Sequence, residues 1–114
     1  MKTTAWCFLE NKSMIRHMAL YTLTEKAHEE GVESVVNKIN SSVKRMMGVV
    51  PGLIHAEALL NVAEDSPHDL IFYSEFERME DIGPYLKSEA HHAHASMADG
   101  YVKNKEGVDV FVGK

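Results

Sequence analysis

Residues 15–23 alternate in the two-residue period of a β-strand. Apart from His17, the predicted strand is apolar on both sides, and Met18 and Leu20 belong to its second face. A strand with two apolar faces is typical of a sheet that is covered on both sides. The first face consists of Ile15, His17, Ala19, Tyr21 and Leu23.

The next segment predicts one amphipathic helix, because apolar residues recur at spacings of three and four. Thr24 can cap the start of this helix, and Lys44 and Arg45 suit its last turn. We expect it to end near Gly48, since glycine tolerates a left-handed cap and Pro51 cannot continue the helix. The apolar positions are Val32, Val35, Val36, Ile39, Val43, Met46 and Met47.

Two further stretches, 53–61 and 69–77, read as strands. The connector 62–68 between them is short and polar and contains Pro67. This pattern predicts an antiparallel hairpin.

The last third of the chain predicts helices and a final strand. A helical segment begins near residue 79, and we expect a break near Gly83-Pro84. Ser88 can cap a second short helix. Valines at every second position of 108–112 predict a fourth strand.

The predicted order is β-α-β-β-α-β, which indicates an α+β, ferredoxin-like fold with a four-stranded antiparallel sheet. Its helices cover one face of the sheet, so the other apolar face needs a cover. A second copy of the chain supplies one economically, and we expect a homodimer. We expect one domain over residues 14–114, preceded by an N-terminal extension over residues 1–13.

Composition excludes several classes of protein. The formal charge is −5 and the longest basic run is Lys44-Arg45, which argues against nucleic acid as a partner. The single Cys7 excludes a disulfide framework within the chain and suits a reducing compartment. The apolar run 5–9 is too short for a signal peptide or a membrane span, so we expect a cytoplasmic protein without membrane contact.

Three short segments together resemble the stress-responsive α/β-barrel (Dabb) family. They are Met14-Ile15-Arg16-His17, Val50-Pro51-Gly52-Leu53 and Asp69-Leu70-Ile71-Phe72-Tyr73-Ser74-Glu75-Phe76-Glu77. The family motif Tyr-x-x-His-Pro-x-His is matched by residues 85–91 at Tyr85 and His91, whereas Ser88 and Glu89 replace the usual His-Pro.

The resemblance implies a homodimer in which two sheets form a dimeric α/β barrel, with a pocket in each protomer. It implies a stress-associated role without a cofactor. Some plant members are cofactor-free polyketide cyclases that use the equivalents of Tyr85 and His91 in an aldol-type ring closure. We therefore expect His17, Tyr85 and His91 to line a small apolar pocket for a carbonyl-bearing or aromatic ligand.

In a cyclase-like lyase, His91 would abstract an acidic proton and Tyr85 would hydrogen-bond the developing enolate oxygen, while His17 orients His91 or the ligand. Tyr85 and His91 are six positions apart and would diverge by about 120° on an unbroken helix. The interpretation therefore requires a break near Ser88. Glu89 beside the base could hold His91 charged.

Other interpretations stay open. His17 can be a core histidine that hydrogen-bonds a backbone carbonyl, and the histidines near residue 91 can form a solvated helix face, with His92 pointing away from His91. The chain can be a structural dimer without chemistry, or a cofactor-free monooxygenase, because that class shares the dimeric ferredoxin-like plan.

A metal site has weak support. His91 and His94 share a helical face, with Glu89 or Asp99 as nearby oxygen ligands. Two histidines without a fixed third ligand do not define a site, and we expect no metal.

Overall fold

The computed structural model describes residues 14–112 of the chain. In chain order the elements are β1 (Met14–Leu23), α2 (Glu25–Glu30), α3 (Val32–Met46), β2 (Leu53–Leu60), β3 (Leu70–Phe76), the 3₁₀ turn η1 (Met79–Asp81), α4 (Ile82–Lys87), α5 (Glu89–Ala98) and β4 (Val102–Val112). The predicted N-terminal extension, residues 1–13, lies outside the described residues.

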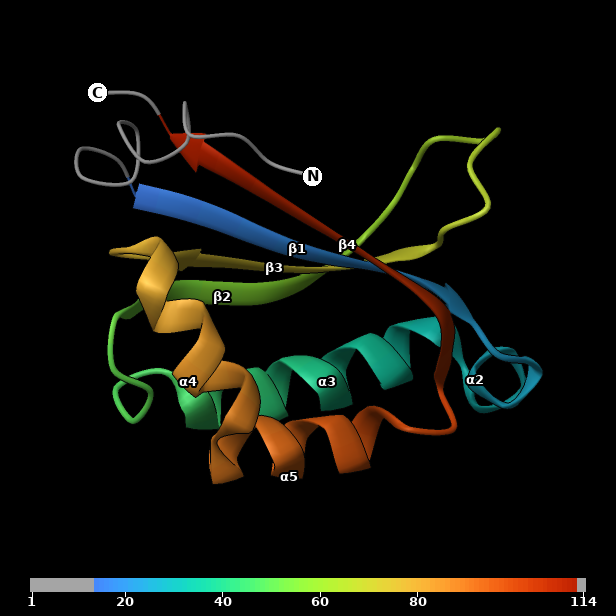
Figure 1. The fold of residues 1–114 in the computed structure, drawn as a ribbon. Helices are drawn as coiled ribbons and strands as arrows, with labels where there is room; N and C mark the ends of the chain where they lie inside the picture. The colour runs from blue at the N-terminus through green and yellow to red at the C-terminus, as the bar shows by residue number, and fades with distance from the viewer. Residues whose placement is uncertain (1–13, 113–114) are drawn as a thin grey trace.

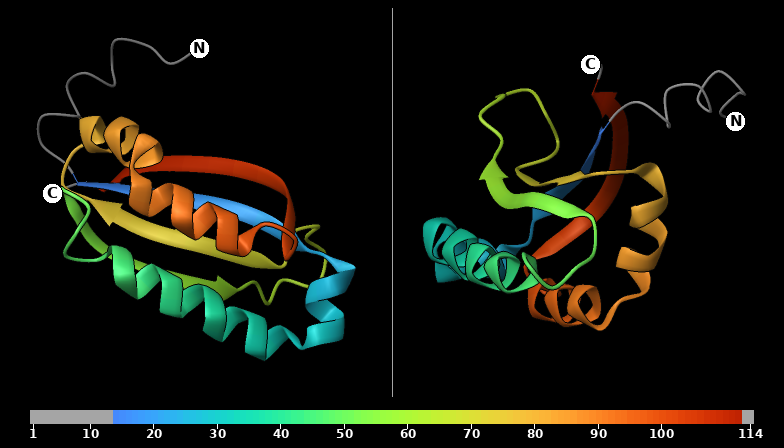
Figure 2. Two further views of the ribbon diagram at one scale, coloured as in Figure 1. Left: turned by 90° about the horizontal axis from the view of Figure 1, so that it is seen from below. Right: turned by 90° about the vertical axis from the view of Figure 1, so that its left-hand side faces the viewer.

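The four strands form one antiparallel sheet in the order β2-β3-β1-β4. Helices α3 and α5 lie side by side on one face of this sheet, as Figures 1 and 2 show. The predicted ferredoxin-like fold and the hairpin of β2 and β3 are confirmed. None of the described helices is long and apolar enough to cross a membrane.

The core lies between the sheet and α3, whose apolar stripe is nearly inaccessible to solvent. Val35, Ile39 and Val43 are each at most 1% exposed, and they belong to one core cluster with Ile15 and Phe76. Truncating one of the large buried side chains to alanine typically costs about 2–5 kcal/mol of stability. This packing holds the sheet against the helices. It therefore also fixes the positions of the side chains at the edge of the core, where the sheet and the helices meet.

The predicted single helix is wrong at one point, because it is divided into α2 and α3 at Gly31. Gly31 has φ 110° and ψ 116°, a conformation that other residues rarely adopt. Its N–H still bonds the carbonyl of Ala27, and its carbonyl accepts the N–H of Val35. The apolar positions begin only at Val32, after the break, so their spacing does not reveal it. The predicted end near Gly48 agrees with α3 ending at Met46.

The expected break near Gly83-Pro84 is also wrong. Both residues lie in the first turn of α4, where proline is tolerated because its missing N–H would have no helical acceptor. The break falls at Ser88, which is extended at φ −74° and ψ 155°. Its hydroxyl accepts the His91 N–H at 3.1 Å and donates to the Tyr85 carbonyl at 2.7 Å. Ser88 caps the second helix, α5, as predicted.

The last strand is longer than the expected 108–112. It runs from Val102 to Val112 because it pairs with β1 along its length, including a polar stretch that has no apolar alternation. One irregularity interrupts the pairing between Leu20 and Thr22 of β1.

The second face of the sheet has no helix over it in the described chain, as Figure 2 shows from two directions. It mixes apolar and polar side chains, and Val110 is 39% exposed and Leu59 41% exposed there. Pairing places Arg16 of β1 opposite Glu75 of β3 on this face. Its apolar residues include Met14, Met18, Leu20, Leu59, Ile71, Val108, Val110 and Val112.

Candidate functional site

Tyr85 and His91 lie next to each other although six residues separate them. Tyr85 is the fourth residue of α4, and His91 is in the first turns of α5. The extended backbone of Ser88 turns the chain between the two helices, so the ring centroids are 4.9 Å apart at an interplanar angle of 73°. The break that the cyclase interpretation requires is present, and the two side chains can act on one group.

Both side chains present an unpartnered polar atom. Among the described residues, neither the Tyr85 hydroxyl nor Nδ1 of His91 has a hydrogen-bond partner, and both atoms are buried. Tyr85 itself is 2% exposed. Buried polar groups normally have partners, because an unmade hydrogen bond costs about 1–3 kcal/mol. The pair therefore has hydrogen-bonding capacity that the described residues do not use.

Burial keeps both groups uncharged near neutral pH. Burial raises the pKa of the Tyr85 hydroxyl well above its ordinary value, and nearby Tyr21 adds to the shift. Burial also lowers the pKa of His91, and the charge of Lys105 lowers it further. Tyr85 stays a hydrogen-bond donor, and His91 stays a neutral base. The expectation that Glu89 holds His91 charged is wrong, because Glu89 is exposed and burial dominates the shift.

His17 pairs with a carboxylate that the sequence analysis did not identify. Its Nδ1 lies 2.5 Å from Oδ1 of Asp109, and the two residues are paired in register across β1 and β4. The sequence also allowed His17 to bond a backbone carbonyl, but its Nδ1 bonds the Asp109 carboxylate instead. The carboxylate favours the tautomer with hydrogen on Nδ1 and leaves Nε2 as the acceptor.

His17 also faces the tyrosine. Its ring centroid is 6.5 Å from that of Tyr85 and 6.4 Å from that of Phe76, both edge-on. Phe76 in turn packs against Tyr85 at 5.2 Å. The three residues expected to line a pocket, His17, Tyr85 and His91, thus form a chain of ring contacts from β1 through α4 to α5.

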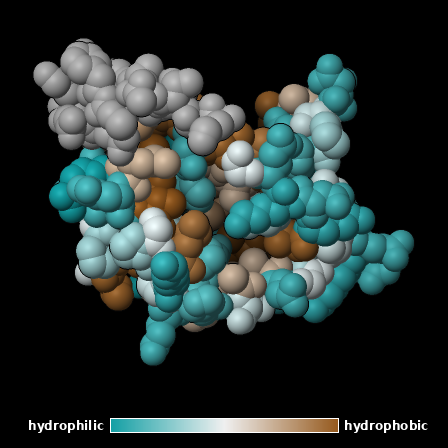
Figure 3. Space-filling model, in the orientation of Figure 1, coloured by the Kyte–Doolittle hydropathy of each residue, from teal (hydrophilic) through white to brown (hydrophobic). Residues whose placement is uncertain are grey.

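Small residues lie beside this group on the same face of the sheet. Ala19 pairs with Gly107 one step along from His17 and Asp109. A Cβ added at Gly107 would meet no heavy atom within 4 Å. Space is therefore open beside Gly107, whereas Ala19 is 2% exposed. In Figure 3 the face of the molecule is hollowed near its centre, with apolar side chains visible inside.

The remaining histidines of α5 differ from His91. His92 is exposed, as its position on the helix predicts. His94 is buried, its Nδ1 lies 3.1 Å from the Ser42 hydroxyl, and its ring stacks on Phe72 at 4.7 Å. Burial lowers the pKa of His94 to about 4. This histidine joins α5 to α3 and the sheet, so the expectation of a wholly solvated histidine face is wrong.

The described part of the chain contains no cluster of side chains that would support a metal site. Within residues 14–112, no three His, Cys, Asp or Glu side chains gather closely enough to hold an ion. Nδ1 of His94 already contacts Ser42.

Comparison with known proteins places this chain in a family. The profile of the stress responsive A/B barrel domain (Dabb) matches residues 15–112. No curated protein sequence matches the chain significantly.

Solved structures share the fold at low sequence identity. A dimeric ferredoxin-like protein of Bacteroides fragilis is 20% identical, with a TM-score of 0.73 over 87% of this chain and 96% of its own. A Dabb protein of Mesorhizobium loti is 22% identical, with a TM-score of 0.65 over 87% of this chain and 96% of its own.

A hydroxynitrile lyase of Passiflora edulis is 8% identical, with a TM-score of 0.69 over 90% of this chain and 95% of its own. At these identities the likeness is one of fold. The family profile covers nearly the whole described chain, and the chain therefore belongs to the stress-responsive A/B barrel (Dabb) family.

Proposed function

We propose that this Dabb protein binds a small carbonyl compound and moves a proton at the carbon next to the carbonyl, as a cofactor-independent lyase or cyclase does. The observation that carries the proposal is the convergence of two buried, unpartnered groups, the Tyr85 hydroxyl and His91 Nδ1. Enolisation needs a hydrogen-bond donor and a neutral base. The backbone of Leu86 also acts on the His91 side chain by a hydrogen bond, but burial dominates and lowers the pKa of His91.

The proposed step balances as follows. His91 takes a proton from the α-carbon, and the electrons of the C–H bond move to the carbonyl oxygen. The Tyr85 hydroxyl donates a hydrogen bond to the resulting enolate oxygen. When the enolate carbon attacks a second carbonyl of the same molecule, the new alkoxide takes the proton back from His91. Base and donor return to their starting states, and the ring closure needs no redox partner.

His17 and Asp109 fit a positioning role in this reaction. Asp109 fixes the orientation and tautomer of His17, in the way a carboxylate orients the histidine of a catalytic triad. The His17 ring then packs edge-on near Tyr85 and limits where a ligand carbonyl can lie.

The departures from the family motif are compatible with this function. Ser88 replaces the motif histidine, yet its extended backbone and its hydroxyl create the turn between the two helices. Glu89 begins α5 at an exposed position and favours the positive end of that helix. Neither replacement removes Tyr85 or His91 from the site.

The alternatives differ in their support. The lyase interpretation shares its fold with the hydroxynitrile lyase of Passiflora edulis, and this likeness concerns the fold alone. The monooxygenase interpretation has the fold alone behind it. A structural dimer without chemistry does not explain why two buried polar atoms lack partners.

We also propose that the protein is a homodimer joined through the uncovered face of the sheet. The similar protein of Bacteroides fragilis is described as dimeric. Exposed apolar side chains on this face, such as Val110 and Leu59, suit an interface better than solvent.

The proton-transfer proposal is tested by hydrogen exchange. An α-methyl β-keto ester is dissolved in D₂O, and NMR follows the loss of its single α-proton with and without protein. We expect catalysed exchange that falls at least ~100-fold in His91→Ala. The neighbouring, exposed His92→Ala is the matched control and should exchange normally. Equal rates in His91→Ala and the wild type would contradict the proposal.

A further inference from the structure

Strand β4 contains a bulge beside the proposed site. Leu20 pairs with Glu106 and Thr22 pairs with Lys103, so Tyr21 alone faces the two residues between them, Asn104 and Lys105. Asn104 has φ 55°, a left-handed conformation that is uncommon outside glycine. Bulges of this kind are frequent beside functional sites because they redirect a side chain.

Lys105 lies on the side of the sheet that carries the site, because it is two residues from Gly107, and the bulge places Lys103 on the opposite side. Gly107 and Asp109 lie on this side by the period of the strand, and Asp109 contacts His17 there. The two bulged residues oppose Tyr21, which belongs to the same face of β1 as His17. The electrostatic effect of Lys105 at His91 fits this placement.

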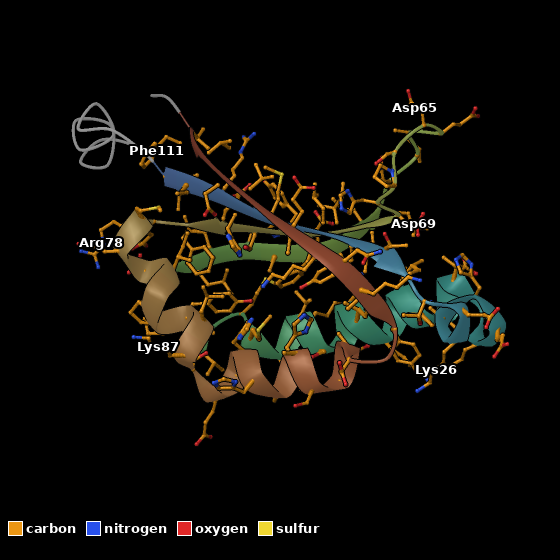
Figure 4. The ribbon with its side chains drawn as sticks, turned by 45° about the vertical axis from the view of Figure 1, so that its right-hand side comes forward. Lys26, Asp65, Asp69, Arg78, Lys87 and Phe111 are labelled. Carbon is orange, nitrogen blue, oxygen red and sulfur yellow. The ribbon has the colours of Figure 1, made fainter. Side chains whose placement is uncertain are left out.

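Other cations of the described chain are engaged or lie elsewhere. Lys26 and Lys38 lie over the Tyr101 ring, at 4.9 and 5.6 Å from its centroid. Arg78 pairs with Asp81. Figure 4 shows Arg78 and Lys87 on the outer side of α4, away from the sheet.

Lys105 is different, because it forms no ion pair with an acidic side chain within residues 14–112, whereas the nearby Asp109 is already paired with His17. An exposed lysine next to an open site is free to meet an anion from solution. Its long side chain can reach a ligand without losing its hydration completely.

We propose that Lys105 is the specificity-determining residue of the site and that the natural ligand is a carbonyl compound carrying a carboxylate or a comparable anion. The carbonyl lies at Tyr85 and His91, the body of the ligand lies beside Gly107, and the anion meets Lys105. This inference rests on the proposed function and names the class of substrate.

Pairs of probes that differ only in charge test whether Lys105 binds the anionic group of the ligand, a role that we call the anchor. Levulinate and para-acetylbenzoate each carry a ketone and a carboxylate, and their methyl esters are the neutral partners. NMR titration gives the affinity of the intact protein for all four. One charge pair at a partly exposed position should make at least one acid bind about three- to tenfold more tightly than its ester. Added salt should reduce this preference.

Variants of two lysines on the same strand show whether Lys105 causes the preference for the acid. Lys105→Met should abolish the preference for the acid and leave ester binding unchanged, and Lys105→Arg should retain the preference. The control is Lys103→Met, because Lys103 pairs with Thr22 on the opposite face and has the same exposed character. It should behave as the wild type.

Several results would overturn the anchor. They are equal binding of acid and ester, a preference that survives in Lys105→Met, a preference lost equally in Lys103→Met, and a wild type that binds none of the four probes. Exchange of the α-proton of the neutral β-keto ester tests the proposed proton transfer independently of Lys105. Normal exchange in the wild type without any acid preference would refute the role of Lys105 alone, whereas acid preference without exchange would refute the proton transfer alone.

Discussion

Asp109 Oδ1 lies 2.5 Å from Nδ1 of His17, across paired positions of β4 and β1. The carboxylate accepts a hydrogen bond and holds the imidazole in one orientation beside Tyr85. The role that follows is one of positioning, since Asp109 acts through His17 and not on the ligand.

Asp109→Asn should therefore reduce catalysis without unfolding the protein. An amide can present its N–H to His17 and favour the wrong tautomer, so we expect kcat for α-proton exchange to fall about 100-fold while KM changes little. Kinetics and a urea melt measure both effects. Glu106→Gln, on the same strand and the opposite face, is the control. A loss of stability that accounts for the lost activity would refute the positioning role.

Tyr85→Phe should separate stability from activity. The Tyr85 hydroxyl is buried without a partner among the described residues, so its removal takes away a desolvation cost. We expect an unfolding free energy equal to the wild type or up to about 1 kcal/mol higher, together with loss of exchange activity. A variant destabilised by more than about 1 kcal/mol would show that the hydroxyl has a structural partner.

Stability should depend on pH through His94. Its pKa is about 4 in the folded protein and 6.5 in the reference state. Between these values the unfolded chain binds more protons, so the stabilising contribution is complete above pH 6.5 and is lost as the pH falls toward 4. The lowered pKa of His91 acts in the same direction.

Urea midpoints at about pH 7.5 and about pH 5 measure this dependence. The difference between them should shrink in His94→Gln, which keeps a polar group near the Ser42 hydroxyl. His92→Gln is the control, because His92 is exposed on the same helix. An unchanged difference in His94→Gln would show that other groups cause the acid sensitivity.

The proposed dimer depends on the uncovered face of the sheet. Val110→Lys places a charge there, on a residue 39% exposed in the single chain, and should convert the dimer to a monomer at micromolar concentration. Light scattering coupled to size exclusion measures the mass. Lys103→Glu, at the far end of the same strand, should leave the dimer intact. A monomeric wild type would contradict the proposal outright.

The sequence predicted the elements whose signals are local. Ser88 was identified as a helix cap, and the turn it makes is what brings Tyr85 to His91. The sequence does not reveal the break at Gly31, because the apolar spacing of the predicted helix begins only after it, at Val32. Pro84 gives the wrong prediction of a helix break, because proline is acceptable in the first turn of a helix and the sequence does not mark where that turn begins.

Asp109 could not be predicted in the same way. Its partner His17 is 92 residues away, and the pairing depends on the register between two strands at opposite ends of the chain. The only local signal is that Asp109 lies between Val108 and Val110, which assigns it to the face opposite the valines. The bulge that places Lys103 and Lys105 on opposite faces likewise follows from register and not from composition.

The most direct test of the central claim is isotope-edited infrared spectroscopy of a bound ketone. The carbonyl of ¹³C-labelled para-acetylbenzoate methyl ester reports any hydrogen bond to its oxygen. If the buried Tyr85 hydroxyl and His91 receive a ligand carbonyl, the stretching band of the bound ketone should lie at lower frequency than in water, and the shift should vanish in Tyr85→Phe. A bound ketone with the same band in the wild type and in Tyr85→Phe would contradict the account.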